Sequence, residues 1–359
     1  MEPLIPIFDA HLDLAWNALS FNRDLSLPLE ELQQAETHAT DGSFRGRCVA
    51  SLPELQQSGV RVCIATLLVR SGQRRPEIFP VLRKDLEYAS CPIARAHAIG
   101  QLAYYQWLAD SGDVRLVRTA RELQDHWAEG SSAPLGIILS FEGCDPILDP
   151  DDAYFWYGEG VRAAGLTHYG IGQYAHGTGH EGPLMPQAAD LLQAFEELGI
   201  VLDVTHLSDQ SMAQVLEDFT GPVLASHHNC RALVPGQRQL SDEQIRLLID
   251  RDAVIGTALD AWMLYAGWQR GQTHRSVVSL ATAADHIDHI CSLAGNARHC
   301  AIGSDLDGGF GSDQTPLGLD RYRDIQKLSG ILRNRGYTAA EVHGIFHGNL
   351  RRLFTRCLR

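Results

Sequence analysis

The sequence predicts one (β/α)8 barrel of the TIM type with additional helices, formed by residues 1–359 as a single domain. Two observations favour this α/β fold: eight short apolar runs recur along the chain, and helix-forming segments follow most of them. Continuous apolar runs are typical of strands buried on both faces, as in a parallel sheet. Because no linker rich in Pro, Gly or Ser divides the chain, the alternation favours one closed barrel over two domains.

The predicted strands are short, and Gly or Pro bounds several of them. Eight such runs match the number of strands in a barrel of this type. In chain order they are Leu4–Phe8, Val60–Leu68, Gly136–Ser140, Gly165–Thr167, Ile200–Val204, Val223–Ala225, Val254–Ala258 and Cys300–Gly303.

Helix signals occupy the segments between these runs. Gln187–Leu198 has apolar residues at helical spacing, and Gly199 follows it as a stop signal. Ser208 predicts the N-cap of a further helix. The long stretch Pro76–Asp110 predicts one or two helices that elaborate the plain barrel. Capping boxes are predicted at Ser241–Gln244 and Thr338–Glu341.

Composition limits the classes of partner. The formal net charge is -14, the only lysines are Lys84 and Lys327, and no basic run occurs, which argues against nucleic-acid binding. No stretch approaches the roughly 20 apolar residues of a membrane span, and Met1–Phe8 lacks the regions of a secretion signal. The cysteines form no CxxC pair and are expected to be free thiols. We therefore expect a cytoplasmic protein that acts on a small molecule, without a membrane or nucleic-acid partner.

Side chains that can bind metal follow six of the predicted strands. The carboxyl ends of the strands in such a barrel meet at one face, where active sites lie. A single histidine or aspartate after a strand is usually a hydrogen-bonded or helix-capping residue. Six such strand ends together favour a metal site, because buried charges are costly unless they are paired or bound to metal. The residues are His11, Asp13, Glu142, His168, His206, His227 and Asp305.

The spacing of these residues predicts two ions. His11 and Asp13 are two residues apart in an extended segment, so both can reach one ion. His206 and His227 follow neighbouring strands and could hold a second ion. Two close cations need a shared anion. In many binuclear barrels a carboxylated lysine bridges the metals, but neither lysine ends a strand here, so Glu142 is the predicted bridge. Imidazoles and carboxylates without thiolates are consistent with two Zn²⁺ ions, and also with manganese, iron or cobalt.

An ordered set of motifs resembles the membrane (renal) dipeptidase family, peptidase family M19, of the amidohydrolase-like metallo-dependent hydrolases. An HxD motif alone is weak, but the ordered set is specific and covers nearly the whole chain. The motifs are DAHLDLAW (Asp9–Trp16), SFEG (Ser140–Gly143), LTH (Leu166–His168), DVTHLS (Asp203–Ser208), SHHNCRAL (Ser226–Leu233), RQLSDEQI (Arg238–Ile245), IGSDLDG (Ile302–Gly308) and IFHGNLRRLF (Ile345–Phe354).

The resemblance implies a binuclear zinc dipeptidase in which a metal-bridging hydroxide attacks the amide bond of a dipeptide, L-Xaa-D-Xaa dipeptides included. It implies that His168 polarises the scissile carbonyl and that Asp305 handles the protons of the bridging water. Arg238 matches the arginine that pairs with the terminal carboxylate of the substrate. The implied metal ligands are His11, Asp13, Glu142, His206 and His227.

The chain also departs from the family's pattern. Gly256–Tyr265 differs from the corresponding segment of the renal enzymes and is expected to line the pocket, where Asp260 would meet the substrate's ammonium or cap a turn. We expect Asp307 to orient its loop and His228 to lie outside the ligand set. Animal members are secreted and lipid-anchored. Because no secretion signal is expected here, this chain is expected to be a cytoplasmic bacterial-type member. Whether it forms a homodimer is left open.

Two other functions stay open at this point. The same metal centre could hydrolyse a related amide, lactam or ester instead of a dipeptide. The chain could also be a decayed, non-catalytic homologue that serves as a binding partner. Loss of a ligand would indicate decay, and no predicted ligand is missing from the sequence.

Overall fold

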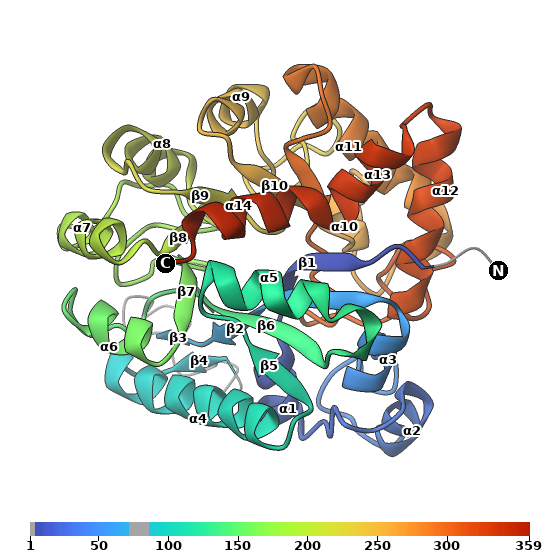
Figure 1. The fold of residues 1–359 in the computed structure, drawn as a ribbon, viewed down its shortest axis with the longest axis horizontal. Coiled ribbons are helices and arrows are strands. Elements are labelled where there is room, and N and C mark those ends of the chain that lie inside the picture. The colour runs from blue at the N-terminus through green and yellow to red at the C-terminus, as the bar shows by residue number, and fades with distance from the viewer. Residues whose placement is uncertain (1–3, 72–85) are drawn as a thin grey trace.

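The computed structural model describes residues 4–71 and 86–359. Eight parallel strands close into a barrel, because β2 pairs with both β1 and β6 and the last strand, β11, pairs with β1. Figure 1 shows helices arranged around these strands, and the predicted (β/α)8 barrel is confirmed. The barrel strands are β1 (Ile7–Leu12), β2 (Val60–Leu68), β6 (Leu135–Glu142), β7 (Val161–Gly165), β8 (Val201–Asp203), β9 (Val223–Ala225), β10 (Val254–Thr257) and β11 (Cys300–Ile302).

Helices connect the strands and cover the outside of the barrel. No helix among the described residues is long and apolar enough to cross a membrane. The α-helices are α1 (Leu14–Phe21), α2 (Leu29–Ala35), α3 (Leu52–Gln57), α4 (Cys91–Asp110), α5 (Ala120–Ala128), α6 (Asp152–Gly158), α7 (Ala188–Leu198), α8 (Asp209–Asp218), α9 (Asp242–Asp250), α10 (Ala261–Leu264), α11 (Leu280–Ala294), α12 (Lys327–Asn334), α13 (Ala339–His343) and α14 (Asn349–Cys357). Short 3₁₀ or π turns occur at Gly130–Ser132, Arg275–Val277, Tyr322–Gln326 and Gly344–Gly348.

The predicted helix ends agree with the structure. Gly199 ends α7 in the left-handed region with φ of 73°, and Ser208 caps α8 by accepting a hydrogen bond from the Ser211 amide. Ser241 and Thr338 form the two predicted capping boxes. These local signals therefore correctly placed the starts and ends of helices around the barrel.

Some strands differ from the sequence prediction. The first strand, β1, covers Ile7–Leu12 rather than Leu4–Phe8. The fourth, β7, covers Val161–Gly165 rather than Gly165–Thr167; the prediction missed its start because Arg162 interrupts the apolar pattern, and this arginine donates to the carbonyls of Arg118, Tyr157 and Val161. In the stretch Pro76–Asp110 the described residues form one helix, α4, in agreement with the one or two helices predicted; residues 76–85 lie outside the described residues. The sequence did not predict three short strands, β3 (Arg70–Ser71), β4 (Glu87–Tyr88) and β5 (Val114–Leu116).

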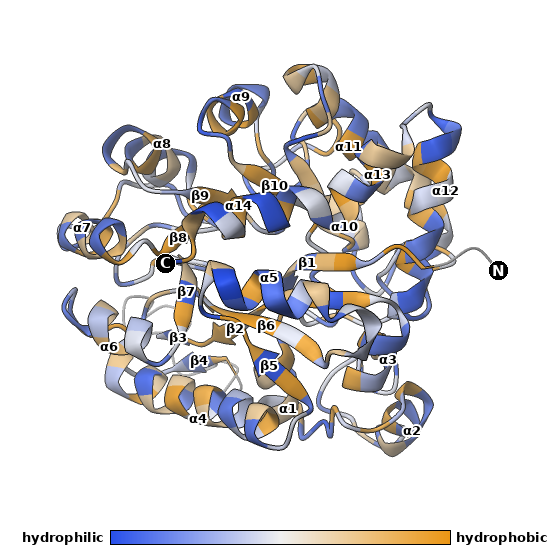
Figure 2. Ribbon diagram, viewed as in Figure 1, coloured by the Kyte–Doolittle hydropathy of each residue, from blue (hydrophilic) through white to orange (hydrophobic). Residues whose placement is uncertain are grey.

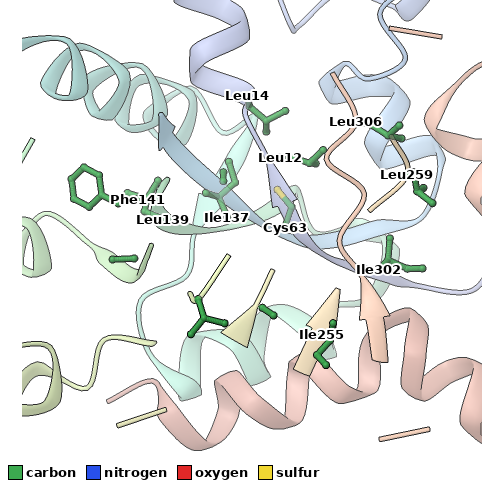
Figure 3. Close-up of a cluster of buried hydrophobic side chains, with 14 of the residues drawn as sticks. Leu12, Leu14, Cys63, Ile137, Leu139, Phe141, Ile255, Leu259, Ile302 and Leu306 are labelled. Atoms are coloured by element: carbon green, nitrogen blue, oxygen red, sulfur yellow. The ribbon is translucent and has the colours of Figure 1, made fainter. Parts of the chain in front are cut away.

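Two apolar clusters hold the barrel together. The larger one lies between the strands and the surrounding helices, as Figure 3 shows for side chains such as Leu12, Ile137 and Ile302. The other fills the barrel interior, where α14 lies across one end and its Phe354 ring packs 5.6 Å from the ring of Phe8. Figure 2 shows the matching pattern, with apolar strands inside helices of mixed polarity. Burial of apolar surface is the main favourable term for folding.

An irregularity in β1 directs two predicted ligands toward the barrel mouth. Between Asp9 and Leu12, three residue steps of β1 span the same length as two steps of β2. Ala10 faces the barrel interior, whereas Leu12 belongs to the outer cluster, so the alternation of side chains reverses at this point. A β-bulge of this kind inserts one residue and re-aims the side chains that follow it. His11 and Asp13 can therefore both face the open end of the barrel.

Two glycines, one on β10 and one directly after β11, make room for the backbone at Ser226, the residue before His227. A Cβ atom on Gly256 would lie 1.9 Å from the carbonyl oxygen of Ser226, and one on Gly303 would lie 1.8 Å from the same oxygen. Both distances are far shorter than van der Waals contact, and the obstacle is backbone that cannot move aside. These positions therefore require glycine for close approach of the backbone.

We predict that Gly303→Ala lowers the free energy of unfolding by about 3 kcal/mol, because overpacking against fixed backbone strains the barrel. Gly330→Ala is the matched control, since a Cβ there meets nothing within 4 Å and Gly330 lies inside α12. This control should be neutral or stabilising by about 0.5–1 kcal/mol. Urea denaturation of both variants measures the difference, and equal stabilities would contradict the packing argument.

Candidate metal centre

The predicted ligands converge at the carboxyl ends of the barrel strands. His11 lies on β1 and Asp13 follows it, Glu142 ends β6, and the other histidines and Asp305 lie in the loops that follow their strands. All of the ligands predicted from the sequence are buried, and His168 is partly exposed to the pocket. The structure thus brings the predicted set together.

The carboxylate of Glu142 lies at the centre of this set. Its Oε1 atom is 3.2 Å from Nε2 of His206 and 3.4 Å from Nε2 of His227. The same oxygen is 3.6 Å from Nε2 of both His11 and His168. The structure thus places Glu142 among the histidines with which it was predicted to bind metal.

A second group of oxygen donors flanks His11. Its Nε2 atom lies 3.4 Å from Oδ1 of Asp13 and 3.9 Å from Oδ1 of Asp305, and it has no hydrogen-bond partner among the described residues. Three sets of donors are each close enough together to hold one ion. They are His11 with Glu142 and His227, Glu142 with His168 and His206, and His11 with Asp13 and Asp305.

Neighbouring hydroxyl groups orient the ligands. Oγ1 of Thr178 is 2.9 Å from Nδ1 of His206, and Oγ of Ser226 is 2.9 Å from Nδ1 of His227. Thr66 donates to Asp13 from β2. Hydrogen bonds at Nδ1 leave Nε2 directed at the centre, which is how metal-binding histidines are normally held.

The carboxylates at the centre lack sufficient positive charge around them. Burial raises the pKa of Glu142, and the charge of Asp13 adds to the rise. Burial also raises the pKa of Asp305 well above its usual range. Ionised carboxylates in such a place are costly unless a cation joins them. The donors present therefore fit divalent metal ions.

The histidines show the complementary pattern. Burial and nearby positive groups lower the pKa of His206 and His227 well below the usual range, so both are neutral. Neutral imidazole is the form that binds metal. Burial also disfavours charge on His11, but the charges of Glu142 and Asp13 outweigh it and raise the pKa of His11.

The backbone is strained at two of these positions. His206 has φ of 69° and Asp305 has φ of 54°, which places both in the left-handed region that glycine favours. Such conformations persist where the surroundings hold them and are frequent at functional sites. Asp307, with φ of 64°, accepts hydrogen bonds from the amides of Val49 and Ala50, so it does orient its loop as expected.

Arg238 lies beside the histidines with two donors unused. Its Nη2 atom donates to the carbonyl of His227 at 3.0 Å and lies 3.4 Å from Nε2 of His206. Its Nε and Nη1 atoms have no acceptor among the described residues, although the side chain is buried. Buried donors without partners are rare and mark places where a ligand can bind.

Asp260 follows β10 and lies in the same pocket. It accepts hydrogen bonds from Nε2 of Gln314 at 2.7 and 2.9 Å and from the Trp262 amide at 3.2 Å, so it caps α10. Burial raises its pKa to about 7. Both roles expected of Asp260 are thus open to it at once, because the capping carboxylate also lines the pocket.

The pocket has a volume of about 500 Å³ and includes residues that the sequence analysis missed. Most of them lie outside the motifs, so only their position in space shows that they line the pocket. His228 is buried beside the pocket but is not among the residues that line it. Trp262 lies in Gly256–Tyr265, the segment expected to line the pocket. The missed lining residues include Trp16, Arg70, Tyr169, Trp268, Arg270, Phe310 and Gln314.

A barrel with imidazole and carboxylate donors clustered at the carboxyl ends of its strands is typical of metal-dependent hydrolases. Comparison of the sequence with protein families agrees with this class. The chain belongs to the membrane dipeptidase family (peptidase family M19), whose family model matches residues 3–357. The resemblance described from the motifs is therefore confirmed.

Two curated relatives illustrate the similarity. The dipeptidase aclJ of Aspergillus oryzae is 28% identical over 228 residues, which cover 62% of this chain and 52% of that protein. A Klebsiella pneumoniae protein from the pqqA 5' region is 30% identical over 235 residues, covering 63% of this chain and 83% of that one. The matched region thus spans about half the length of the fungal relative.

Two solved structures share the fold. A dipeptidase AC of family M19 superposes with a TM-score of 0.80 at 21% identity and covers 99% of both chains. A metallopeptidase from Rhodobacter sphaeroides, bound to a phosphinate mimic of L-Ala-D-Ala, has a TM-score of 0.78 at 21% identity. That match covers 99% of this chain and all of the other.

We predict that Glu142→Gln lowers the affinity for divalent metal by more than about 100-fold. Loss of an outer partner of a ligand already costs about 10–100-fold, and the Glu142 carboxylate lies within 3.6 Å of four imidazole nitrogens of the cluster. Metal content after dialysis, measured by plasma mass spectrometry, gives the result. Glu217→Gln, an exposed carboxylate on α8, is the control and should keep its metal. Equal metal content in both variants would exclude Glu142 as a ligand.

Proposed function

We propose that this protein is a metal-dependent dipeptidase that hydrolyses the amide bond of free dipeptides. The observation that carries the proposal is Arg238, whose unused donors lie in the same pocket as the imidazole and carboxylate cluster. An arginine fork suits a carboxylate, and a dipeptide presents its carboxylate one residue away from the scissile bond. The family membership and the names of the relatives support this choice.

The proposed metal sites keep the assignment expected from the sequence, and the clustering of the donors supports it. We assign His11 and Asp13 to one cation and His206 and His227 to the other, with Glu142 shared between them. Zinc is the metal proposed, because the donors are imidazoles and carboxylates without a thiolate, and most of them line an accessible pocket. Two such cations lower the pKa of water and polarise a carbonyl group, which makes hydroxide available near neutral pH.

The remaining residues act on protons and charge. Asp305 lies next to the first metal site and would accept the proton of the attacking water and pass it to the leaving amine. His168 would donate a hydrogen bond to the carbonyl oxygen as negative charge develops there. Asp260 would bind the ammonium group of the substrate from the opposite loop. The side chains that would fill these roles all line one pocket.

The first experiment is a panel of L-Xaa-L-Xaa and L-Xaa-D-Xaa dipeptides with the purified protein and added Zn²⁺. The mixed series belongs in the panel because the Rhodobacter protein binds a mimic of L-Ala-D-Ala. Cleavage with two metal ions bound per chain is the expected result. Failure to cleave any dipeptide with both ions bound would exclude this function and favour a related amide, lactam or ester as substrate.

We also propose that residues 1–359 act as one catalytic domain in the cytoplasm. The continuous barrel and the acidic composition support this view. A homodimer is compatible with it, and light scattering of the purified protein would measure the oligomeric state.

We predict that Arg238→Met lowers kcat/KM for dipeptides by about 10- to 100-fold, because a charged hydrogen-bonded pair is lost. The loss should be absent for a dipeptide amide, which has no terminal carboxylate to bind. Arg121→Met, at an exposed position on α5, is the control for the substitution itself. An equal loss for the dipeptide and its amide would show that Arg238 does not recognise the carboxylate.

We predict that KM for dipeptides rises as the pH falls below about 7, since burial raises the pKa of Asp260 to about 7 and a protonated Asp260 no longer attracts ammonium. In Asp260→Asn this rise should be absent, and KM at pH 8 should be about tenfold higher. Measured KM between pH 5.5 and 8.5 checks both points. A pH profile that is unchanged in the variant would exclude this role.

Through Asp260, a rise in pH favours substrate binding but lowers the free energy of unfolding. An unfolded aspartate ionises near pH 4, so the folded protein binds one more proton than the unfolded chain between about pH 4 and 7. The stability that Asp260 contributes is therefore lost as the pH rises through this window. Asp260→Asn should remove that loss in urea denaturation at pH 5 and pH 8.

A further inference from the structure

Asp260 and Arg270 place opposite charges in one wall of the pocket without neutralising each other. Both line the cavity, and no ion pair within 4.0 Å joins either of them to any described residue. Arg270 donates from Nη2 to the carbonyl of Gly309, which holds its guanidinium across the loop that follows β11. The arrangement offers one anionic and one cationic anchor to a single bound group.

The other cations of the pocket are already engaged. Arg70 pairs with Glu87 at 2.6 Å. Arg238 lies beside His206 and His227, where the proposed function uses it for the terminal carboxylate of the substrate. Among the described residues, Arg270 is therefore the pocket arginine that has neither a carboxylate partner nor a role in the proposed function.

The order of the loops around the barrel mouth sets the order in which Arg238, Asp260 and Arg270 lie along a bound dipeptide. β9, β10 and β11 are neighbours in the barrel. Arg238 follows β9, Asp260 follows β10, and Arg270 reaches the loop that follows β11. If the terminal carboxylate binds at Arg238 and the ammonium at Asp260, Arg270 lies on the far side of the ammonium. It then faces the N-terminal residue of the dipeptide.

We propose that the preferred substrates have an N-terminal residue that carries both a free ammonium and a free carboxylate. Asp260 binds the ammonium and Arg270 binds the carboxylate. This chemistry occurs in α-linked aspartyl and glutamyl dipeptides, whose side-chain carboxylate is free. It also occurs in β-aspartyl and γ-glutamyl dipeptides, whose α-carboxylate is free. The inference rests on the proposed dipeptidase function.

The walls of this part of the pocket favour such a pair. Trp262 and Trp268 line the cavity between Asp260 and Arg270 in the sequence, and Phe310 lines it from the segment after β11, next to Gly309, whose carbonyl accepts from Arg270. Apolar walls that exclude water strengthen the attraction between a guanidinium and a carboxylate. Arg270 is exposed before the substrate binds, so the expected preference is moderate, about fivefold to tenfold.

The test compares kcat/KM for four dipeptides: Glu-Ala, γ-Glu-Ala, Ala-Ala and Ala-Glu, each with the stereochemistry that the protein cleaves best. Ala-Glu has the same net charge as Glu-Ala, but its extra carboxylate is on the other residue. We expect Glu-Ala or γ-Glu-Ala to exceed Ala-Ala by about fivefold to tenfold and Ala-Glu to show no such gain. The better of the first two identifies which linkage the site accepts.

The Arg270 variants separate recognition from general effects. In Arg270→Met the ratio for the preferred substrate over Ala-Ala should fall to about one, and Arg270→Lys should keep part of it. Arg121→Met on α5 should keep the full ratio. A ratio near one in the wild type, or a ratio that survives in Arg270→Met, would overturn the inference while cleavage of Ala-Ala leaves the dipeptidase function intact.

A binding measurement makes the inference independent of turnover. Phosphinate analogues of the preferred dipeptide and of Ala-Ala can be titrated calorimetrically into the metal-loaded protein and into Arg270→Met. The analogue with the additional carboxylate should bind about fivefold to tenfold more tightly to the wild type only. Equal affinities in the wild type would overturn the inference, and absence of dipeptide cleavage alone would overturn only the proposed function.

Discussion

One buried carboxylate oxygen of Glu142 faces four imidazole nitrogens, and the barrel mouth is organised around this arrangement. Asp13 and Asp305 add two further carboxylates close by. Such a concentration of buried acceptors is unfavourable in a protein without added cations. The neutral state of His206 and His227 removes competition from protons at their ring nitrogens. The whole site is consequently suited to bind divalent metal, and the stability of the fold comes from other parts of the barrel.

The two ends of the barrel divide the tasks of stability and function. At one end α14 closes the interior with Leu350, Leu353 and Phe354, all buried. At the other end strained backbone and unpaired polar atoms collect, at His206 and Asp305 for example. Strain and unsatisfied polar groups cost stability, so a site of this kind needs a well-packed frame beneath it. The apolar clusters between strands and helices provide that frame.

Most of the fold, and the clustering of the candidate ligands, could be predicted because they depend on local signals. Apolar runs, capping residues and polar residues at strand ends can each be recognised within a short stretch of sequence. The bulge after Asp9 could not be predicted, since it depends on the pairing of β1 with β2. The hydroxyls of Thr178 and Ser226 also escaped notice, because a threonine or serine becomes a partner of a histidine only through tertiary contact. For the same reason Asp260 could be predicted as a pocket residue, but Gln314, which donates a hydrogen bond to its carboxylate, could not.

Under the proposed function, the position of Asp260 would separate substrate recognition from the metal ligands. β2 and β10 are the two barrel strands without a member of the ligand cluster, and pocket residues that do not bind metal follow both of them: Arg70 follows β2 and Asp260 follows β10. Divalent cations would repel an ammonium group, whereas Asp260 would hold it at the end of a strand that carries no metal ligand, between the strands that precede His227 and Asp305. Because Asp260 also caps α10 and is fixed by Gln314, its carboxylate stays in place when no substrate is bound. Charge separation within the pocket thus follows directly from which strands carry ligands and which do not.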